Sequence, residues 1–306
     1  MEELYKRRRP TKMKEVIGQP GAIATLSGFR KRKIVPSCVL FVGPSGTGKT
    51  TLARILARAL KCDPLDLTEI NAAQDNGVDS VRTLQQRCRM APMGGPVRVY
   101  IMDESHQYTK QAQEAMLKLL EDTPTNVYFF LATTNPKKLL PTIRTRATTV
   151  ETKPVANSDM LDYLKQLAGE EKYDIHADAY DQIVDVADGG VRAAVKMLEQ
   201  ISGLDPESQI DAISNPENDP EVFKLCQQLM AKKLTWSSVA QTLKGIEAHD
   251  PEGVRRMVTG YARAVLLKGA NDRAYSILLN FSETTYDNGR NAIVQFAYQV
   301  YLDSGK

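Results

Sequence analysis

The stretch "FVGPSGTGKTTLARILARAL", from Phe41 to Leu60, decides the fold. Within it, residues 43–50 read GPSGTGKT, which matches the pattern GxxxxGK followed by Ser or Thr. In such a loop the glycines let consecutive backbone N–H groups point at phosphate oxygens. An apolar segment precedes the loop and a helical pattern follows it, so a helix N-terminus would also face the anion. These flanks disfavour the alternative, a glycine-rich turn that binds nothing.

The side chains of this loop have separate expected tasks. Lys49 would reach the β and γ phosphates of a nucleotide, and the Thr50 hydroxyl would be a ligand of Mg²⁺. The predicted nucleotide-binding residues of the loop are Gly43, Pro44, Ser45, Gly46, Thr47, Gly48, Lys49, Thr50 and Thr51.

Two adjacent carboxylates, Asp103 and Glu104, follow the apolar segment "VRVYIM". Nucleotide hydrolysis needs an acidic group for the metal and a group that orients the attacking water. We expect Asp103 to hold Mg²⁺ and Glu104 to polarise water. Two carboxylates after a strand can also be a solvated loop, but the phosphate loop roughly fifty residues upstream favours the catalytic interpretation. A single loop histidine is more often a surface residue than a base, so His106 receives no role.

Four further polar residues are candidates for sensing or neutralising phosphate charge. Thr134 is the last residue of the segment "VYFFLATT", which ends where a γ phosphate could be sensed, and Asn135 is the alternative. Arg146 lies in a loop after the core strands, and such arginines are usually solvated unless they face a neighbouring subunit's nucleotide. Arg192 falls in the first turn of a helix, where the dipole disfavours a cation, so either a phosphate holds it or it is exposed.

The order of segments predicts an α/β fold followed by helices. From about residue 38 to 150, short apolar segments alternate with helical ones, which indicates a parallel sheet with helical crossovers. The predicted organisation is a nucleotide-binding core at 1–153, a small helical domain at 154–203, a linker rich in Pro, Ser and Asn at 204–220, and a helical bundle at 221–306.

The bulk composition is that of an ordinary globular protein. The formal net charge is +3, so nucleic acid would have to meet a local basic surface. The four cysteines lack zinc-ligand spacing and are interpreted as reduced thiols. A charged start and the lack of any apolar segment near the roughly 18 residues of a membrane span predict a soluble, cytoplasmic protein with no membrane partner.

These motifs, in this order, resemble the clamp-loader ATPases of the AAA+ superfamily, namely the bacterial gamma/tau subunits and the replication factor C small subunits. The resemblance covers about the first two hundred residues, and beyond them only length and helicity are similar. It implies an AAA+ core with a parallel sheet, a helical lid domain and a C-terminal helical collar. It also implies ATP and Mg²⁺ as cofactors and, as partners, a sliding clamp, primer–template DNA and further subunits in a homo- or hetero-oligomeric, pentameric ring.

The resemblance also assigns residues position by position. It implies an adenine site at Arg9, Pro10, Val16 and Ile17, a finger that acts in trans at Arg146, sensors at Thr134 and Arg192, and DNA phosphate contacts at Arg82 and Thr109. Three features depart from the family: the finger segment reads Thr-Arg-Ala instead of Ser-Arg-Cys, Arg8 replaces the usual aromatic residue, and the zinc-binding insertion is missing. The short form is similar to phage, archaeal or minimal loaders.

The expected function is that of an ATP-hydrolysing clamp-loader subunit, which opens a sliding clamp and places it on primer–template DNA. A second hypothesis is another AAA+ DNA motor, such as a branch-migration helicase or a helicase loader, in which a winged helix or similar module would replace the collar. A third is a non-catalytic scaffold subunit of a ring. The intact set of Lys49, Asp103 and Glu104 disfavours the scaffold.

Overall fold

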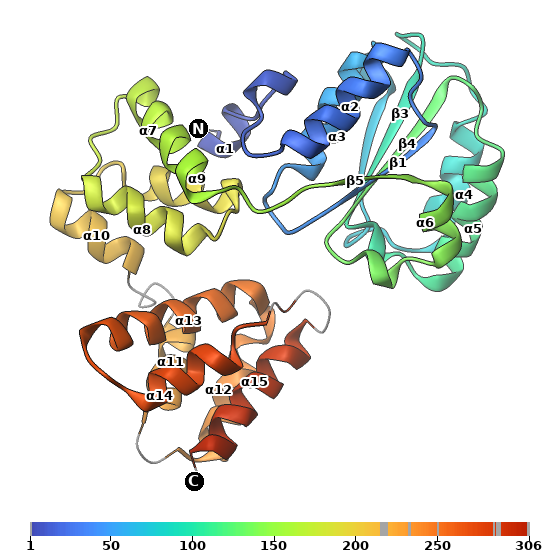
Figure 1. The fold of residues 1–306 in the computed structure, drawn as a ribbon. Helices are drawn as coiled ribbons and strands as arrows, with labels where there is room; N and C mark the ends of the chain where they lie inside the picture. The colour runs from blue at the N-terminus through green and yellow to red at the C-terminus, as the bar shows by residue number, and fades with distance from the viewer. Residues whose placement is uncertain are drawn as a thin grey trace. The chain divides into compact units, whose positions relative to one another are not determined.

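The structure is a computed structural model that describes residues 2–214, 220–231, 234–249, 251–283, 285 and 289–304 (Figure 1). The chain divides into two compact units. The first consists of Met1–Gly169 and Ala187–Glu199, and the second of Glu170–Val186 and Gln200–Lys306. Residues 154–203, predicted to be one lid domain, are thus shared between the units, and the boundaries at 153 and 203 stay a prediction.

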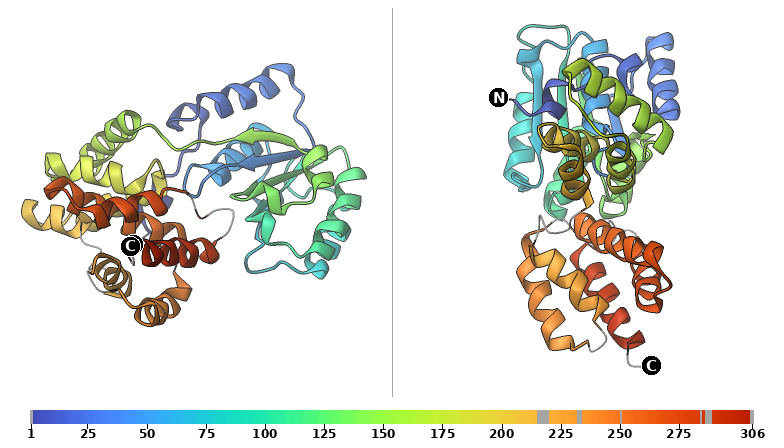
Figure 2. Two further views of the ribbon diagram at one scale, coloured as in Figure 1. Left: turned by 60° about the horizontal axis from the view of Figure 1, so that its bottom comes forward. Right: turned by 90° about the vertical axis from the view of Figure 1, so that its left-hand side faces the viewer.

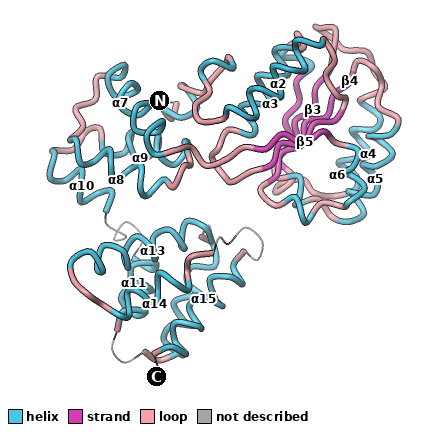
Figure 3. Tube along the Cα trace, viewed as in Figure 1, coloured by secondary structure: helices cyan, strands magenta, loops and turns pink. Residues whose placement is uncertain are grey.

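The first unit is built on a five-stranded parallel sheet with the strand order β2-β3-β4-β1-β5 (Figure 3, magenta). The predicted α/β class with a parallel sheet is confirmed. The interior strands are buried on both faces, as expected when helical crossovers cover a sheet. The strands are β1 Cys38–Val42, β2 Leu67–Asn71, β3 Arg98–Asp103, β4 Val127–Thr133 and β5 Thr148–Glu151.

Helices cover both faces of this sheet (Figures 1 and 2). Side chains alternate along β1, so that Val39 and Phe41 belong to the core under one helical layer and Leu40 to the core under the other. The first layer consists of α2 (Pro20–Arg32) and α3 (Lys49–Ala59), and the second of α4 (Val78–Arg87), α5 (Lys110–Glu121) and α6 (Pro141–Arg146).

Short elements complete the first unit. Helix α1 is fastened to α9, because the backbone N–H of Leu4 donates to both carboxylate oxygens of Glu199, at 3.0 and 3.1 Å. The remaining elements are α1 (Leu4–Arg7), η1 (Met13–Glu15), η2 (Pro64–Asp66), η3 (Ser105–Gln107), η4 (Pro136–Lys138), most of α7 (Asn157–Glu171) and most of α9 (Val191–Ile201).

All secondary-structure elements described in the second unit are helices (Figure 2). Helices α11 to α15 share one apolar core, in agreement with the predicted helical bundle. The helices are α8 (Ala177–Ala187), α10 (Pro206–Ser214), α11 (Pro220–Met230), α12 (Trp236–Gly245), η6 (Ile246–Ala248), α13 (Pro251–Lys268), α14 (Asp272–Asn280) and α15 (Arg290–Asp303). In the part of the chain that is described, none of the helices combines the length and apolar character of a membrane span.

The segment 204–220 was predicted to be a linker, and this prediction is wrong for 206–214, which form α10. The Asp205 carboxylate accepts hydrogen bonds from the N–H of Ser208 (3.1 Å) and from its hydroxyl (2.6 Å), so Asp205 caps the helix, and Pro206 occupies its first position. Asp, Pro and Ser are frequent in linkers and also at helix starts, and this explains the error. Residues 215–219 lie outside the described residues.

Candidate nucleotide site

The phosphate loop connects β1 to α3, and its conformation is constrained by contacts with Thr152, the residue after β5. Gly46 has φ +76°, which suits glycine. Gly43 lies so close to Thr152 that a Cβ there would be 2.2 Å from the threonine hydroxyl oxygen. The Thr47 hydroxyl donates to the carbonyl oxygen of Pro44 (2.8 Å) and lies 2.8 Å from the Thr152 hydroxyl. The loop is therefore held in one conformation by β5 and the residue that follows it.

Lys49 begins α3 and is 6% exposed. Its ammonium group donates to the carbonyl oxygens of Gly43 (2.9 Å) and Pro44 (2.8 Å) of its own loop. Burial lowers the pKa of Lys49, while the nearby carboxylates Glu104 and Asp103 oppose this shift. A cation that donates to two neutral carbonyl oxygens would form stronger, charge-assisted hydrogen bonds with the phosphate oxygens of a bound nucleotide.

Thr50 and Asp103, the two expected ligands of Mg²⁺, lie in contact. The Thr50 hydroxyl donates to Oδ2 of Asp103 at 2.9 Å, and Oδ1 accepts the backbone N–H of Glu104 at 3.0 Å. A hydroxyl and a carboxylate are the oxygen ligands that Mg²⁺ prefers in proteins. The donor set therefore fits Mg²⁺, and these two residues are the ones that would hold it.

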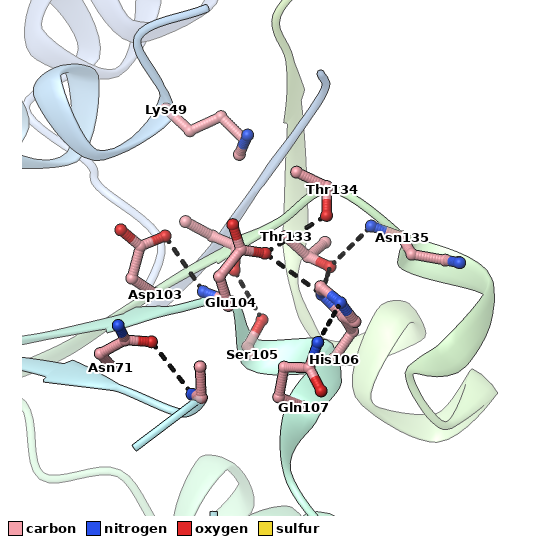
Figure 4. Close-up of polar contacts among 12 residues, drawn as sticks. Lys49, Asn71, Asp103, Glu104, Ser105, His106, Gln107, Thr133, Thr134 and Asn135 are labelled. Atoms are coloured by element: carbon pink, nitrogen blue, oxygen red, sulfur yellow. Dashed lines mark hydrogen bonds and ion pairs between the residues drawn. The ribbon is translucent and has the colours of Figure 1, made fainter. Parts of the chain in front are cut away.

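Glu104 lies between Asp103 and Thr134 (Figure 4). It adopts a left-handed backbone conformation with φ +48°, and the Thr134 hydroxyl donates to its Oε2 at 3.2 Å. Burial and the charge of Asp103 raise the pKa of Glu104, and Lys49 acts in the opposite direction. A half-buried carboxylate with a raised pKa beside a phosphate loop suits the activation of a water molecule.

His106 is the residue that sequence reasoning missed. A surface position was expected, but its side chain is only 8% exposed. Its Nδ1 lies 3.0 Å from the Thr133 hydroxyl oxygen and 3.4 Å from Oε2 of Glu104 (Figure 4). Burial, together with Lys138 and Lys49, lowers the pKa of His106 to about 4. The sequence signal that could have located it is its position directly after the two carboxylates.

Asn135, the alternative to Thr134 as a sensor, follows β4 and is buried. Its backbone N–H donates to the Thr133 hydroxyl oxygen at 3.1 Å. Of the three consecutive polar residues at the end of β4, Thr134 is the one whose side-chain hydroxyl donates to Glu104, whereas the side chain of Asn135 points away from Glu104 (Figure 4).

Arg192 lies beside the phosphate loop, although 146 positions separate it from Gly46 in the chain. Its backbone N–H is 3.5 Å from the Gly46 carbonyl oxygen, and its guanidinium group is 5.8 Å from the centre of the Tyr5 ring. The first turn of α9 thus borders the phosphate loop, as expected if Arg192 senses phosphate.

The predicted adenine residues line the same pocket as the phosphate loop, Asp103, Glu104 and Arg192. Burial lowers the pKa of Arg9, and Arg54 and Arg192 add to this effect. The residues from the N-terminal segment that line the pocket are Tyr5, Arg8, Arg9, Pro10, Glu15, Val16 and Ile17.

The predicted finger, Arg146, does not line the pocket of its own chain. It is exposed at the end of α6, where it donates to the carbonyl oxygen of Thr142 (3.0 Å) and pairs with Glu121. Its neighbour Arg144 is also exposed. The structure therefore leaves Arg146 on the surface, where a contact with another subunit is sterically open.

The predicted DNA contacts are exposed, Arg82 within α4 and Thr109 at the start of the adjacent helix α5. Arg82 is in α4 and pairs with Asp79 at 3.0 Å. The Thr109 hydroxyl caps α5 by accepting the N–H of Ala112 at 3.2 Å, and the backbone N–H of Thr109 donates to the carbonyl oxygen of Asn76, just before α4, at 3.1 Å. The backbone bond therefore ties the two helix starts together.

The sequence is similar to those of clamp-loader subunits. Residues 65–156 match the family model described as DNA polymerase III, delta subunit. DNA polymerase III subunit tau of Bacillus subtilis is 33% identical over 64% of this chain and 39% of its own length. The gamma/tau subunit of Mycoplasma genitalium is 27% identical over 91% of this chain and 50% of its own length, so this match extends into the C-terminal helices.

An archaeal protein is similar over more of its own length. The replication factor C small subunit of Methanothermobacter thermautotrophicus is 29% identical over 74% of this chain and 72% of its own length. By contrast, the chain spans only 39% to 50% of the length of the two bacterial relatives.

Solved structures establish the fold. The Thermotoga maritima RuvB Holliday junction branch migration motor superposes with a TM-score of 0.55 over 97% of this chain and 91% of its own, at 19% identity. At this identity the likeness concerns the fold alone. The chain has the AAA+ fold, and its homologues are the gamma/tau and replication factor C small subunits, which confirms the resemblance to AAA+ clamp-loader subunits on which the motif assignments rest.

Proposed function

We propose that the chain is an ATP-hydrolysing subunit of a clamp loader, which opens a sliding clamp and places it on primer–template DNA. The observation that carries this proposal is the position of Glu104. Its half-buried carboxylate borders the same pocket as Lys49 and the Thr50–Asp103 pair, and the Thr134 hydroxyl donates to it. The names of the relatives supply the clamp-loading part of the proposal.

The proposed reaction is the transfer of the γ phosphoryl group of ATP to water. Glu104 would orient and deprotonate the water, while Lys49 would leave its carbonyl partners and bind phosphate oxygens. Thr50 and Asp103 would hold Mg²⁺, which would supply positive charge that neutralises the phosphates. Thr134 and Arg192 would detect whether the γ phosphate is present.

The proposed domains divide these tasks. Residues 1–153 would bind ATP, 154–203 would form a lid that carries Arg192, and 221–306 would form the collar of a pentameric ring. In the described part of the second unit there are helices and no strand, which supports a collar over a winged helix. We therefore favour clamp loading over a branch-migration helicase or a helicase loader.

The exposed position of Arg146 supports a role in trans. In a ring, the Arg146 guanidinium would leave Glu121 and contact the nucleotide of the adjacent subunit. There it would neutralise charge in the transition state. Arg146→Ala should leave ATP affinity intact and lower steady-state hydrolysis by about 1,000-fold at any ATP concentration. Arg144→Ala is the matched control, because Arg144 is exposed on the same helix; equal rates for both variants would remove the finger assignment.

Arg82 and Thr109 are proposed to contact DNA phosphates. Arg82 offers an exposed cation within α4, and Thr109 offers an exposed hydroxyl at the start of the adjacent helix α5, which supports this proposal. Such contacts follow the duplex without reading its sequence, and this suits a protein that accepts any primed site.

The proposed function is tested by the steady-state ATPase rate of the purified chain, alone and with primer–template DNA, with the sliding clamp of the same genome, and with both. We expect strong stimulation that requires both ligands. Stimulation by DNA that the clamp does not change would instead favour another DNA motor. No hydrolysis in any condition, including with companion subunits, would contradict the proposal.

A further inference from the structure

The motifs assign no role to His106, but the residues around it indicate one. Helix η3, which carries His106, begins directly after Glu104 and is anchored to β4 by the buried Ser105 hydroxyl, which donates to the carbonyl oxygen of Ala132 at 3.0 Å. The imidazole is consequently fixed against the end of β4, where Thr133 and the sensor residues lie (Figure 4).

The hydrogen bonds of the ring determine which nitrogen carries the proton. The Gln107 side-chain amide nitrogen, which can only donate, lies 3.1 Å from Nε2 of His106. With the amide nitrogen as the donor, Nε2 accepts and the neutral ring carries its hydrogen on Nδ1. Nδ1 lies 3.0 Å from the Thr133 hydroxyl oxygen and 3.4 Å from Oε2 of Glu104.

We propose that His106 is a positioning residue for ATP hydrolysis, whose neutral Nδ1–H, shared between Thr133 and Oε2 of Glu104, orients the Glu104 carboxylate for the attacking water. The Thr134 hydroxyl donates to the same oxygen. The carboxylate is thus oriented from two chain segments, by His106 on one side and by Thr134, whose backbone N–H also donates to Glu104, on the other. This inference rests on the proposed function.

The surroundings also keep the ring neutral. The ring faces Glu104, which would favour a charged imidazole, and Lys138 and Lys49, which oppose it; burial is the largest influence and lowers the pKa to about 4. A neutral ring can orient Glu104 through a hydrogen bond without forming an ion pair that would lower the basicity of the carboxylate.

Two variants of similar size separate orientation from packing. His106→Asn keeps an N–H donor near the place of Nδ1, whereas His106→Leu fills the space without one. We expect His106→Leu to lower kcat about tenfold, since a small misplacement of a catalytic group can cost up to about 100-fold. The affinity for a fluorescent ATP analogue should stay unchanged, and His106→Asn should recover most of kcat. Wild-type kcat in His106→Leu, or equal losses in both variants, would overturn the proposal.

A second readout does not depend on activity or on the variants' folding. The chain has three histidines, and ¹⁵N-histidine labelling with long-range ¹H–¹⁵N spectra distinguishes their tautomers. We expect one ring, His106, to be the Nδ1–H form at pH 7 and to shift in Glu104→Gln. If that ring is the Nε2–H form or charged, the proposal is wrong. If wild type and all variants lack ATPase activity while this spectrum is as expected, the failure belongs to the proposed function and not to the geometry of His106.

Discussion

Buried charged groups at the two ends of the same sheet differ in how fully the chain itself supplies their hydrogen-bond and ion-pair partners. At the amino ends of β2 and β3, Asp66 is 1% exposed and accepts the N–H groups of Met93 (2.7 Å), Gly94 (2.8 Å) and Gly95 (3.0 Å) as well as the Arg98 guanidinium (3.2 Å). At the carboxyl ends of the strands, the Thr134 hydroxyl and the His106 imidazole contact Glu104, and Lys49 donates to two carbonyl oxygens of its own loop.

The pKa shifts of Asp66, Glu104 and Lys49 agree with this difference. Burial raises the pKa of Asp66, but the backbone N–H groups and Arg98 outweigh burial and lower it to about 2. For Glu104, burial prevails and raises the pKa, and for Lys49 burial lowers it. Charge at the amino end is therefore compensated within the chain and stabilises the fold. Charge at the carboxyl end is less well compensated, as suits a site that a ligand completes.

Replacing a carboxylate by an amide should therefore lower activity at the carboxyl end of the sheet and lower the free energy of unfolding at the amino end. At the carboxyl end, Glu104→Gln should lower kcat for ATP by about 1,000-fold, as expected for loss of a general base. The free energy of unfolding should stay equal or rise, because the ionised form of Glu104 is disfavoured by burial. Turnover assays and urea unfolding measure both. A rate near that of wild type would contradict the assignment of Glu104.

At the amino end, Asp66→Asn should lower the free energy of unfolding by about 3 kcal/mol, because Arg98 loses its counter-ion and an amide N–H₂ faces backbone donors. The variant should still bind ATP when folded. Asp63→Asn is the matched control: Asp63 caps η2 by accepting the N–H of Leu65 at 2.9 Å, a role that Asn also fills, so its effect should be small. Equal destabilisation by both changes would refute the special position of Asp66.

The stability difference between wild type and Asp66→Asn should depend on pH. A carboxyl whose pKa is lower in the folded chain stabilises the fold above its ordinary pKa of 3.8, and this contribution disappears as the pH falls toward about 2. Urea unfolding at a series of pH values should show a constant difference from pH 7 to 5 that narrows below pH 4. A difference that stays constant down to pH 3 would mean that Asp66 acts through packing and not through its charge.

The sequence predicts the carboxyl end better than the amino end for a physical reason. The residues of the phosphate loop are contiguous, and Asp103 ends a strand that Glu104 directly follows, so local patterns locate them. The Asp66–Arg98 pair joins residues 32 positions apart, and no local pattern announces it. Burial of His106 likewise depends on Thr133, 27 positions away on another strand.

Helix α10 was missed for a different reason. Its start at Pro206, capped by Asp205, uses the same residue types as a linker, and its attachment depends on the buried Gln209. The Gln209 amide donates to the carbonyl oxygens of Asp174 (2.8 Å) and Leu204 (2.9 Å). Asp174, 35 positions away, becomes a neighbour of Gln209 only once the second unit has folded, so composition alone could not reveal the helix.

The central claim is that a nucleotide completes the carboxyl end of the sheet, and the most direct test is the affinity for Mg²⁺ and ATP, measured by calorimetry on wild type and Lys49→Ala. We predict one ATP per chain and an affinity at least about tenfold weaker in the variant, since a charge-assisted hydrogen bond contributes roughly 1.5–3 kcal/mol. Equal affinity in both proteins, or no binding by wild type, would contradict the account.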